Sequence, residues 1–146
     1  MTTSLPFTII SHSESDTEQI GKSLGDCLIT SGNSNSFIAM YGDLGAGKTA
    51  FVRGLASAVT PCARVCSPTY TVVNEYRGSG RRLCHFDMYR IESDDDLWSI
   101  GFYDYDNCMI VAEWCEKIPF ALPEHYVSVR IEKINETERK IQAEWM

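Results

Sequence analysis

Three stretches of the chain place apolar residues three or four positions apart, which is the spacing of one helix face. The first predicted helix spans about 15–30, because a capping-box pattern, S-x-x-E, begins at Ser15. The second runs from about residue 48 until Pro61 stops it. The third is a short helix over 93–101 that ends at a glycine. The pattern therefore predicts two main helices before residue 62 and a short helix in the second half.

Strand-like runs, rich in β-branched and aromatic residues, are predicted at 37–41, 71–76, 83–88, 109–112, 126–131 and 139–145. A Gly-Ser-Gly turn joins the second run to the third, which indicates an antiparallel hairpin. The fourth run is wholly apolar, as is typical of a buried central strand, and the last two are expected to close the sheet. The sequence thus predicts one α/β domain over residues 1–146, with a mixed, mostly parallel sheet flanked by helices.

Residues 42–49 read G-x-x-x-x-G-K-T and lie between the strand 37–41 and the second helix. In this setting the pattern is typical of a phosphate-binding loop, the P-loop or Walker A motif, whose main-chain NH groups and helix N-terminus bind phosphates. The charge of Lys48 suits β- and γ-phosphates, and the hydroxyl of Thr49 suits magnesium. The motif predicts a P-loop NTPase-like domain that binds a nucleoside triphosphate with Mg²⁺.

Two other interpretations of the same residues are an ordinary strand-to-helix turn and a dinucleotide fingerprint, Gly45-x-Gly47-x-x-Ala50. The fingerprint requires an acid about twenty residues further on to hold a ribose. Position 66 is a cysteine and the nearest acid is Glu75, so the sequence disfavours a dinucleotide.

Magnesium at a phosphate loop needs a carboxylate across from the loop. Glu113 directly follows the apolar run 109–112, as a Walker B acid follows its strand, and an acid ending a buried strand otherwise lacks a reason. Asp87 lies in the strand-like run 83–88 and is the second candidate. Its alternative is a surface residue of the hairpin or an ion pair with Arg90.

Three further features have two interpretations each. The segment Ser67-Pro68-Thr69-Tyr70 stands where a switch segment senses a γ-phosphate, and it also fits a β-turn. His85 suits a proton carrier or a structural histidine in a strand. Trp114 alone would be a core residue or an exposed aromatic.

Composition limits the partners. Thirteen basic and twenty acidic residues give a net charge of -7, the wrong sign for a protein that grips nucleic acid by its phosphates. We expect no DNA partner, and an RNA substrate would be held mostly by another subunit. The six cysteines form no C-x-x-C pair, and neither a signal peptide nor a long apolar run is present, which predicts a reduced, cytoplasmic protein without a membrane partner.

Four ordered segments together resemble the TsaE family, bacterial ATPases required for threonylcarbamoyladenosine formation in tRNA. They are G-D-L-G-A-G-K-T at 42–49, S-P-T-Y-T at 67–71, H-F-D-M-Y-R at 85–90 and Glu113-Trp114. The resemblance runs from about Ser13 to Arg139. It implies ATP and Mg²⁺ as cofactors and slow ATP turnover that the partner proteins TsaB and TsaD activate. TsaD transfers the threonylcarbamoyl group to the adenosine beside the anticodon, so tRNA would be met through the complex.

The resemblance also implies roles for particular residues. Lys48 and Asp87 would be catalytic, with Asp87 orienting water, and Thr49 and Glu113 would hold the metal. The nucleotide-binding residues would be Asp43, Leu44, Gly45, Ala46, Gly47, Lys48, Thr49 and Ala50, with Glu14 and Arg139 near the adenosine. The switch or partner contact would be formed by Ser67, Pro68, Thr69, Tyr70 and Trp114.

Other functions for a phosphate loop are a small GTPase, a nucleotide kinase and a scaffold. The chain has neither an N-K-x-D nor a T-K-x-D guanine-reading segment, and no long Arg-rich lid insert, which disfavours the first two. A nucleotide-gated scaffold, in which ATP binding without hydrolysis organises partners, remains an alternative.

Overall fold

A seven-stranded mixed sheet forms the centre of the computed structural model, which describes residues 4–42, 46–63 and 72–146. The strands are β1 (Phe7–Ser11), β2 (Phe37–Tyr41), β3 (Val73–Gly78), β4 (Arg81–Asp87), β5 (Met109–Glu113), β6 (Val127–Lys133) and β7 (Arg139–Trp145). Their order in the sheet is β1-β7-β6-β2-β5-β4-β3. The four middle strands are parallel to one another, and antiparallel pairs flank them. The α/β class, the mixed sheet and the hairpin β3–β4 are as predicted.

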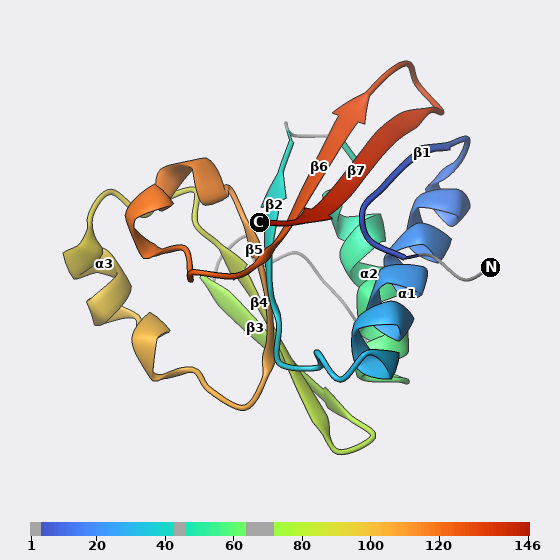
Figure 1. Cartoon of the computed structure of the whole chain (residues 1–146). Helices are drawn as coiled ribbons and strands as arrows, with labels where there is room; N and C mark the ends of the chain where they lie inside the picture. The colour runs from blue at the N-terminus through green and yellow to red at the C-terminus, as the bar shows by residue number, and fades with distance from the viewer. Residues whose placement is uncertain (1–3, 43–45, 64–71) are drawn as a thin grey trace.

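Helices cover both faces of the sheet, as Figure 1 shows. They are α1 (Glu14–Thr30), α2 (Lys48–Val59) and α3 (Asp94–Ser99), with short 3-10 helices η1 (Phe102–Asp104), η2 (Cys115–Lys117) and η3 (Pro119–Ala121). The helices α1 and α2 lie side by side on one face, and α3 with the 3-10 helices lies on the other. Each face buries its own apolar cluster, so the strands between them are shielded from water on both sides.

The helices α1 and α2 approach each other so closely that glycines are required at their contact. A Cβ on Gly21 would lie 2.2 Å from the carbonyl oxygen of Phe51, and one on Gly54 would lie 1.8 Å from that of Glu18. Leu24 and Leu55 are fully buried beside this contact, and burying one such side chain contributes about 1.5–3 kcal/mol. The contact fixes the start of α2, where the phosphate motif ends.

The structure corrects several predicted boundaries. The N-cap of α1 is Ser13, whose side chain accepts a hydrogen bond from the NH of Asp16, so the helix begins before the predicted cap at Ser15. The two hairpin strands lie about two residues from their predicted positions, at Val73–Gly78 and Arg81–Asp87, and residue 71 lies outside the described residues.

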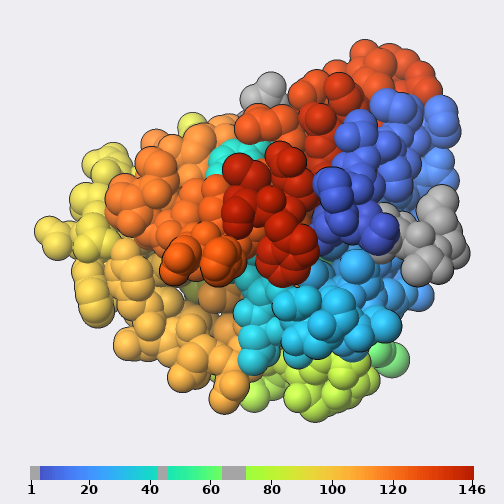
Figure 2. Space-filling view, in the orientation of Figure 1, coloured from blue at the N-terminus to red at the C-terminus, as the bar shows by residue number. Residues whose placement is uncertain are grey.

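The edge of the sheet also differs from the expectation. The last two strands do not close the sheet, because β6 lies next to β2 inside it and β7 pairs with β1. Strand β1 was not predicted and forms one edge. Figure 2 shows the C-terminal residues lying against the N-terminal segment on the face seen there. Within the described ranges, no helix is both long and apolar enough to cross a membrane.

Candidate functional site

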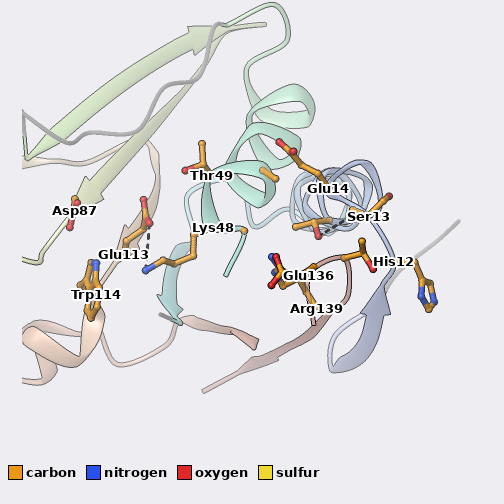
Figure 3. A pocket seen from close by; sticks show the side chains of 14 residues that line it. His12, Ser13, Glu14, Lys48, Thr49, Asp87, Glu113, Trp114, Glu136 and Arg139 are labelled. Atoms are coloured by element: carbon orange, nitrogen blue, oxygen red, sulfur yellow. Dashed lines mark hydrogen bonds and ion pairs between the residues drawn. The ribbon is translucent and has the colours of Figure 1, made fainter. Parts of the chain in front are cut away.

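A pocket of about 590 Å³ lies where α1, the N-terminus of α2 and the carboxyl ends of β4 and β5 meet (Figure 3). The residues that line it are His12, Ser13, Glu14, Thr17, Gly47, Lys48, Thr49, Ala50, Asp87, Glu113, Trp114, Glu136, Thr137 and Arg139. Figure 3 shows Lys48 and Thr49 between Asp87, Glu113 and Trp114 on one side and Glu14, Glu136 and Arg139 on the other. Ligands of α/β proteins bind at this edge of the sheet, outside the carboxyl ends of parallel strands.

The phosphate motif enters α2 through glycines in conformations that other residues rarely adopt. Gly47 is the N-cap of α2 with φ 97°, and Gly42 has φ 150°. A Cβ on Gly42 would lie 2.6 Å from the carbonyl oxygen of Ile131, so only glycine fits there. Lys48 and Thr49 are therefore the first two helical residues, beside the NH groups and positive dipole end of a helix N-terminus.

The ammonium of Lys48 is buried and held by three groups of the chain. Its Nζ donates a hydrogen bond to the carbonyl oxygen of Gly42 at 2.7 Å and lies 3.9 Å from Glu113 Oε1. It also lies 4.5 Å from the centre of the Trp114 ring, a cation–π contact. Because burial of an unpaired charge is costly, these partners fix the ammonium at the pocket wall formed by β5.

Glu113 and Asp87 end neighbouring parallel strands in the same register. Strand β4 pairs with β5 so that Asp87 stands opposite Glu113, which puts both side chains on the sheet face that α2 covers. Glu113 is 7% exposed as a residue, and its carboxylate also contacts His85, at 2.5 Å between Oε2 and Nε2. Asp87 is half-buried, and its Oδ1 accepts a hydrogen bond from the NH of Tyr89. The ends of β4 and β5 thus bring two carboxylates to the pocket that Lys48 also lines.

Trp114 leaves β5 with a strained backbone. Its φ of 60° is in the left-handed region, where a residue other than glycine costs about 1–3 kcal/mol. The conformation lays the indole over Lys48 and against Tyr89, whose ring centre is 5.1 Å away. The next residue, Cys115, is buried, and burial raises the pKa of its thiol to about 12, so it is no nucleophile near neutral pH.

The opposite wall of the pocket comes from α1 and the start of β7. Arg139 donates a hydrogen bond through Nε to the carbonyl oxygen of Ala46, which ties β7 to the phosphate motif. Glu14 forms an ion pair with Arg53 of α2, at 3.2 Å. Nearby, hydrogen bonds with Asn135 and then His12 lower the pKa of Glu138, which keeps this half-buried carboxylate ionised.

The structure brings most of the predicted site residues to one pocket. Glu14, Gly47, Lys48, Thr49, Ala50, Asp87, Glu113, Trp114 and Arg139 all line it. Ala46 is buried beside it and contributes its carbonyl to Arg139. Asp43, Leu44 and Gly45, and the predicted switch residues Ser67, Pro68, Thr69 and Tyr70, lie outside the described residues.

Some pocket residues were not singled out from the sequence. They are His12, Ser13, Thr17, Glu136 and Thr137. The contact of His85 with Glu113 was also missed, although a signal existed: His85 stands two residues before Asp87 and so shares its face of the strand.

The oxygen donors of the pocket fit magnesium. Among the described residues, no group of three or more His, Cys, Asp or Glu side chains could hold a metal ion by itself. Magnesium usually takes only one or two carboxylates from protein and completes its shell with phosphates and waters. The Thr49 hydroxyl and the Glu113 carboxylate line one pocket and are the hard oxygens that such a site uses.

Comparison with known proteins gives a consistent family. A family model described as threonylcarbamoyl adenosine biosynthesis protein TsaE matches residues 11–141. A protein from Haemophilus influenzae named tRNA threonylcarbamoyladenosine biosynthesis protein TsaE is 37% identical over 119 residues, covering 78% of this chain and 74% of the relative. A relative of the same name from Treponema pallidum is 34% identical over 134 residues, covering 90% of this chain and 96% of the relative.

The fold is shared with a solved structure as well. The crystal structure of YdiB from Bacillus subtilis matches with a TM-score of 0.69 and 23% identity, over 97% of this chain and 87% of that chain. The resemblance predicted from the ordered motifs is confirmed. The chain belongs to the TsaE family, whose curated relatives are named tRNA threonylcarbamoyladenosine biosynthesis proteins.

Proposed function

We propose that this protein binds ATP with Mg²⁺ in the described pocket and hydrolyses it, as a cytoplasmic subunit required for N6-threonylcarbamoyladenosine formation in tRNA. The observation that carries the proposal is the placement of Lys48 and Glu113 at 3.9 Å in a pocket that Thr49 and Asp87 also line. One cation for phosphates and two carboxylates across from it are what a metal-dependent triphosphate site requires. The names of the relatives supply the pathway.

The proposal assigns a role to four side chains of the pocket near the phosphates and the metal. Lys48 binds the β- and γ-phosphates, which become a better partner for its ammonium than the wall it contacts now. Thr49 and Glu113 hold the magnesium, which screens phosphate charge when bound. Asp87, half-buried at the end of β4, orients the attacking water or a water on the metal.

Other predicted residues are assigned to the adenosine and to the partner proteins. Glu14 and Arg139 line the wall opposite Glu113 and contact the adenosine. Trp114, with residues 67–70, contacts the partner proteins TsaB and TsaD. The tRNA is bound through that complex, consistent with the net charge of -7.

The proposal is tested by measuring phosphate release from ATP with the isolated protein and again with TsaB and TsaD present. We expect slow release alone, stimulation by the partners, and none when GTP replaces ATP. A rate that the partners leave unchanged, or equal turnover of GTP, contradicts the proposal.

Two variants separate hydrolysis from a scaffold role. Asp87→Asn keeps the size of the side chain and the Lys48 contacts, whereas Lys48→Ala removes the phosphate contact itself. In a reconstituted tRNA-modification assay we expect both variants to fail in repeated cycles. If Asp87→Asn binds ATP, does not hydrolyse it and still supports repeated cycles, ATP binding alone organises the partners and hydrolysis is not required.

A further inference from the structure

His85 has no part in the function proposed above, yet it is the residue in closest contact with the Glu113 carboxylate. Its ring is fully buried in β4, and its Nε2 lies 2.5 Å from Glu113 Oε2. The β4–β5 register sets His85 opposite Val111 and Asp87 opposite Glu113. The histidine therefore lies two residues before the carboxylate pair along the strands, on the same face of the sheet. His85 therefore contacts Glu113 from inside the protein, behind the pocket wall.

The two oxygens of Glu113 have different partners. Oε2 contacts His85, and Oε1 is the oxygen that lies 3.9 Å from Lys48 Nζ. A carboxylate on a residue that is only 7% exposed needs hydrogen-bond donors, because its charge is poorly hydrated. When Lys48 turns to a phosphate, His85 is the partner that remains. The ring then keeps Oε2 in place and leaves Oε1 directed at the pocket.

The contact with Glu113 indicates which ring nitrogen of His85 carries a proton. An ionised carboxylate only accepts hydrogen bonds, so the proton of the contact belongs to Nε2. The other nitrogen, Nδ1, is buried with no hydrogen-bond partner among the described residues. The contact with Glu113 therefore favours a proton on Nε2.

We propose that His85 is a positioning residue: its Nε2–H holds the Glu113 carboxylate so that Oε1 alone is presented to the magnesium of the nucleotide. The proposal rests on the proposed function, because it assigns Glu113 to the metal. Histidine–carboxylate pairs of this kind orient metal ligands elsewhere, and loss of such a supporting partner typically lowers metal affinity by about 10–100-fold.

The test compares ATP affinity in Mg²⁺ with ATP affinity in EDTA for the wild-type chain and two variants. His85→Gln keeps an NH donor near the position of Nε2, and His85→Leu has a similar size without a donor. We expect Mg²⁺ to tighten binding in the wild type and in His85→Gln. In His85→Leu the Mg²⁺-dependent gain should fall by about 10-fold or more while affinity in EDTA stays within about 2-fold.

The outcomes that overturn the inference differ from those that overturn the function. If the ATP affinity of the wild-type chain does not depend on Mg²⁺, both the proposed function and the inference are contradicted. Two results overturn the inference alone and leave His85 a structural residue, provided that Mg²⁺ tightens ATP binding by the wild-type chain. In the first, His85→Leu keeps the full Mg²⁺-dependent gain. In the second, both variants lose ATP affinity to the same extent in Mg²⁺ and in EDTA.

A second measurement does not depend on the His85 variants folding. Nitrogen NMR of the full wild-type chain reports which ring nitrogen of His85 carries the proton. We expect a protonated Nε2, with its resonance shifted in Glu113→Gln. The opposite tautomer, or a His85 signal unaffected by that change, contradicts the proposal even if His85→Leu does not fold.

Discussion

The ammonium of Lys48 has partners within the chain that a bound anion could replace. Its ammonium is buried, and its partners are a carbonyl, a carboxylate and an aromatic ring of the same chain. A triphosphate offers the same ammonium hydrogen-bond acceptors that are themselves negatively charged, whereas the acceptor of its present hydrogen bond is the neutral Gly42 carbonyl. The residue can therefore exchange internal partners for a ligand without being left unpaired.

Lys48→Ala should lose most of its ATP affinity. The β- and γ-phosphates then lose a charge-assisted contact of about 1.5–3 kcal/mol, which corresponds to a Kd higher by about 10–100-fold. Calorimetric titration with ATP and Mg²⁺ measures the change. Lys22→Ala, which removes an exposed lysine of α1 paired with Asp26, is the matched control and should bind as the wild type does. Equal affinity of Lys48→Ala and Lys22→Ala would count against the assignment.

Glu113→Ala should weaken ATP binding in Mg²⁺ more than in EDTA, because the side chain is assigned to the metal. Some loss without the metal is also expected, since Glu113 is a partner of Lys48. The exposed Glu116 lies three residues later and does not line the pocket, so Glu116→Ala serves as the control. Parallel titrations in Mg²⁺ and EDTA give the comparison, and an identical loss in both would remove Glu113 from the metal shell.

The elements that the sequence predicted well are those with a local cause. Strand β2 and helix α2 have the predicted bounds because an apolar run, a glycine-rich bend and Pro61 act over neighbouring residues. The N-cap of α1 was wrong because Ser13 and Ser15 both precede an acid three residues later, so the local pattern does not choose between them.

Elements set by distant partners could not be predicted in this way. Strand β1 exists as an edge because it pairs with β7 at the far end of the chain, with Phe7 opposite Ala143. The contact of His85 with Glu113 likewise depends on the register between β4 and β5, which no short stretch of sequence contains. The predicted carboxylates were found because each ends its own strand.

Because α1 and α2 are in close contact, a small substitution between them should lower the stability of the protein markedly. In Gly54→Ala the new methyl would meet the carbonyl of Glu18 at 1.8 Å, so the helices must separate. Overpacking of this kind typically costs about 1–3 kcal/mol, and backbone has less freedom to yield than a side chain. We expect a lower midpoint of thermal unfolding, followed by circular dichroism.

A control for Gly54→Ala tests whether the helix contact is the cause. Gln19→Ala lies on the exposed side of α1 and should leave the midpoint nearly unchanged. Because α2 begins at Lys48, Gly54→Ala should also weaken ATP binding below its unfolding temperature. A Gly54→Ala protein as stable as Gln19→Ala would show that the helices are not held at this distance.

For the whole molecule, the net charge of -7 bears on the proposal that tRNA is bound by another subunit. A pocket that suits a triphosphate is built into a chain of net charge -7, which repels a polyanion at longer range. The isolated protein should therefore bind tRNA more weakly than about 100 µM at physiological salt. Fluorescence anisotropy with labelled tRNA measures this, with the complex containing TsaB and TsaD as the positive comparison. Micromolar binding by the isolated chain that weakens steeply with salt would assign a tRNA surface to this subunit.

A crystal structure with a nonhydrolysable ATP analogue and Mg²⁺ would show whether the motif at 42–49 and Glu113 together bind a magnesium triphosphate. We predict the triphosphate at the N-terminus of α2, with Lys48 Nζ moved from the Gly42 carbonyl to the phosphates and the metal between Thr49 and Glu113. An analogue bound elsewhere, or Lys48 still held by Gly42 with the pocket empty of phosphate, would contradict the account.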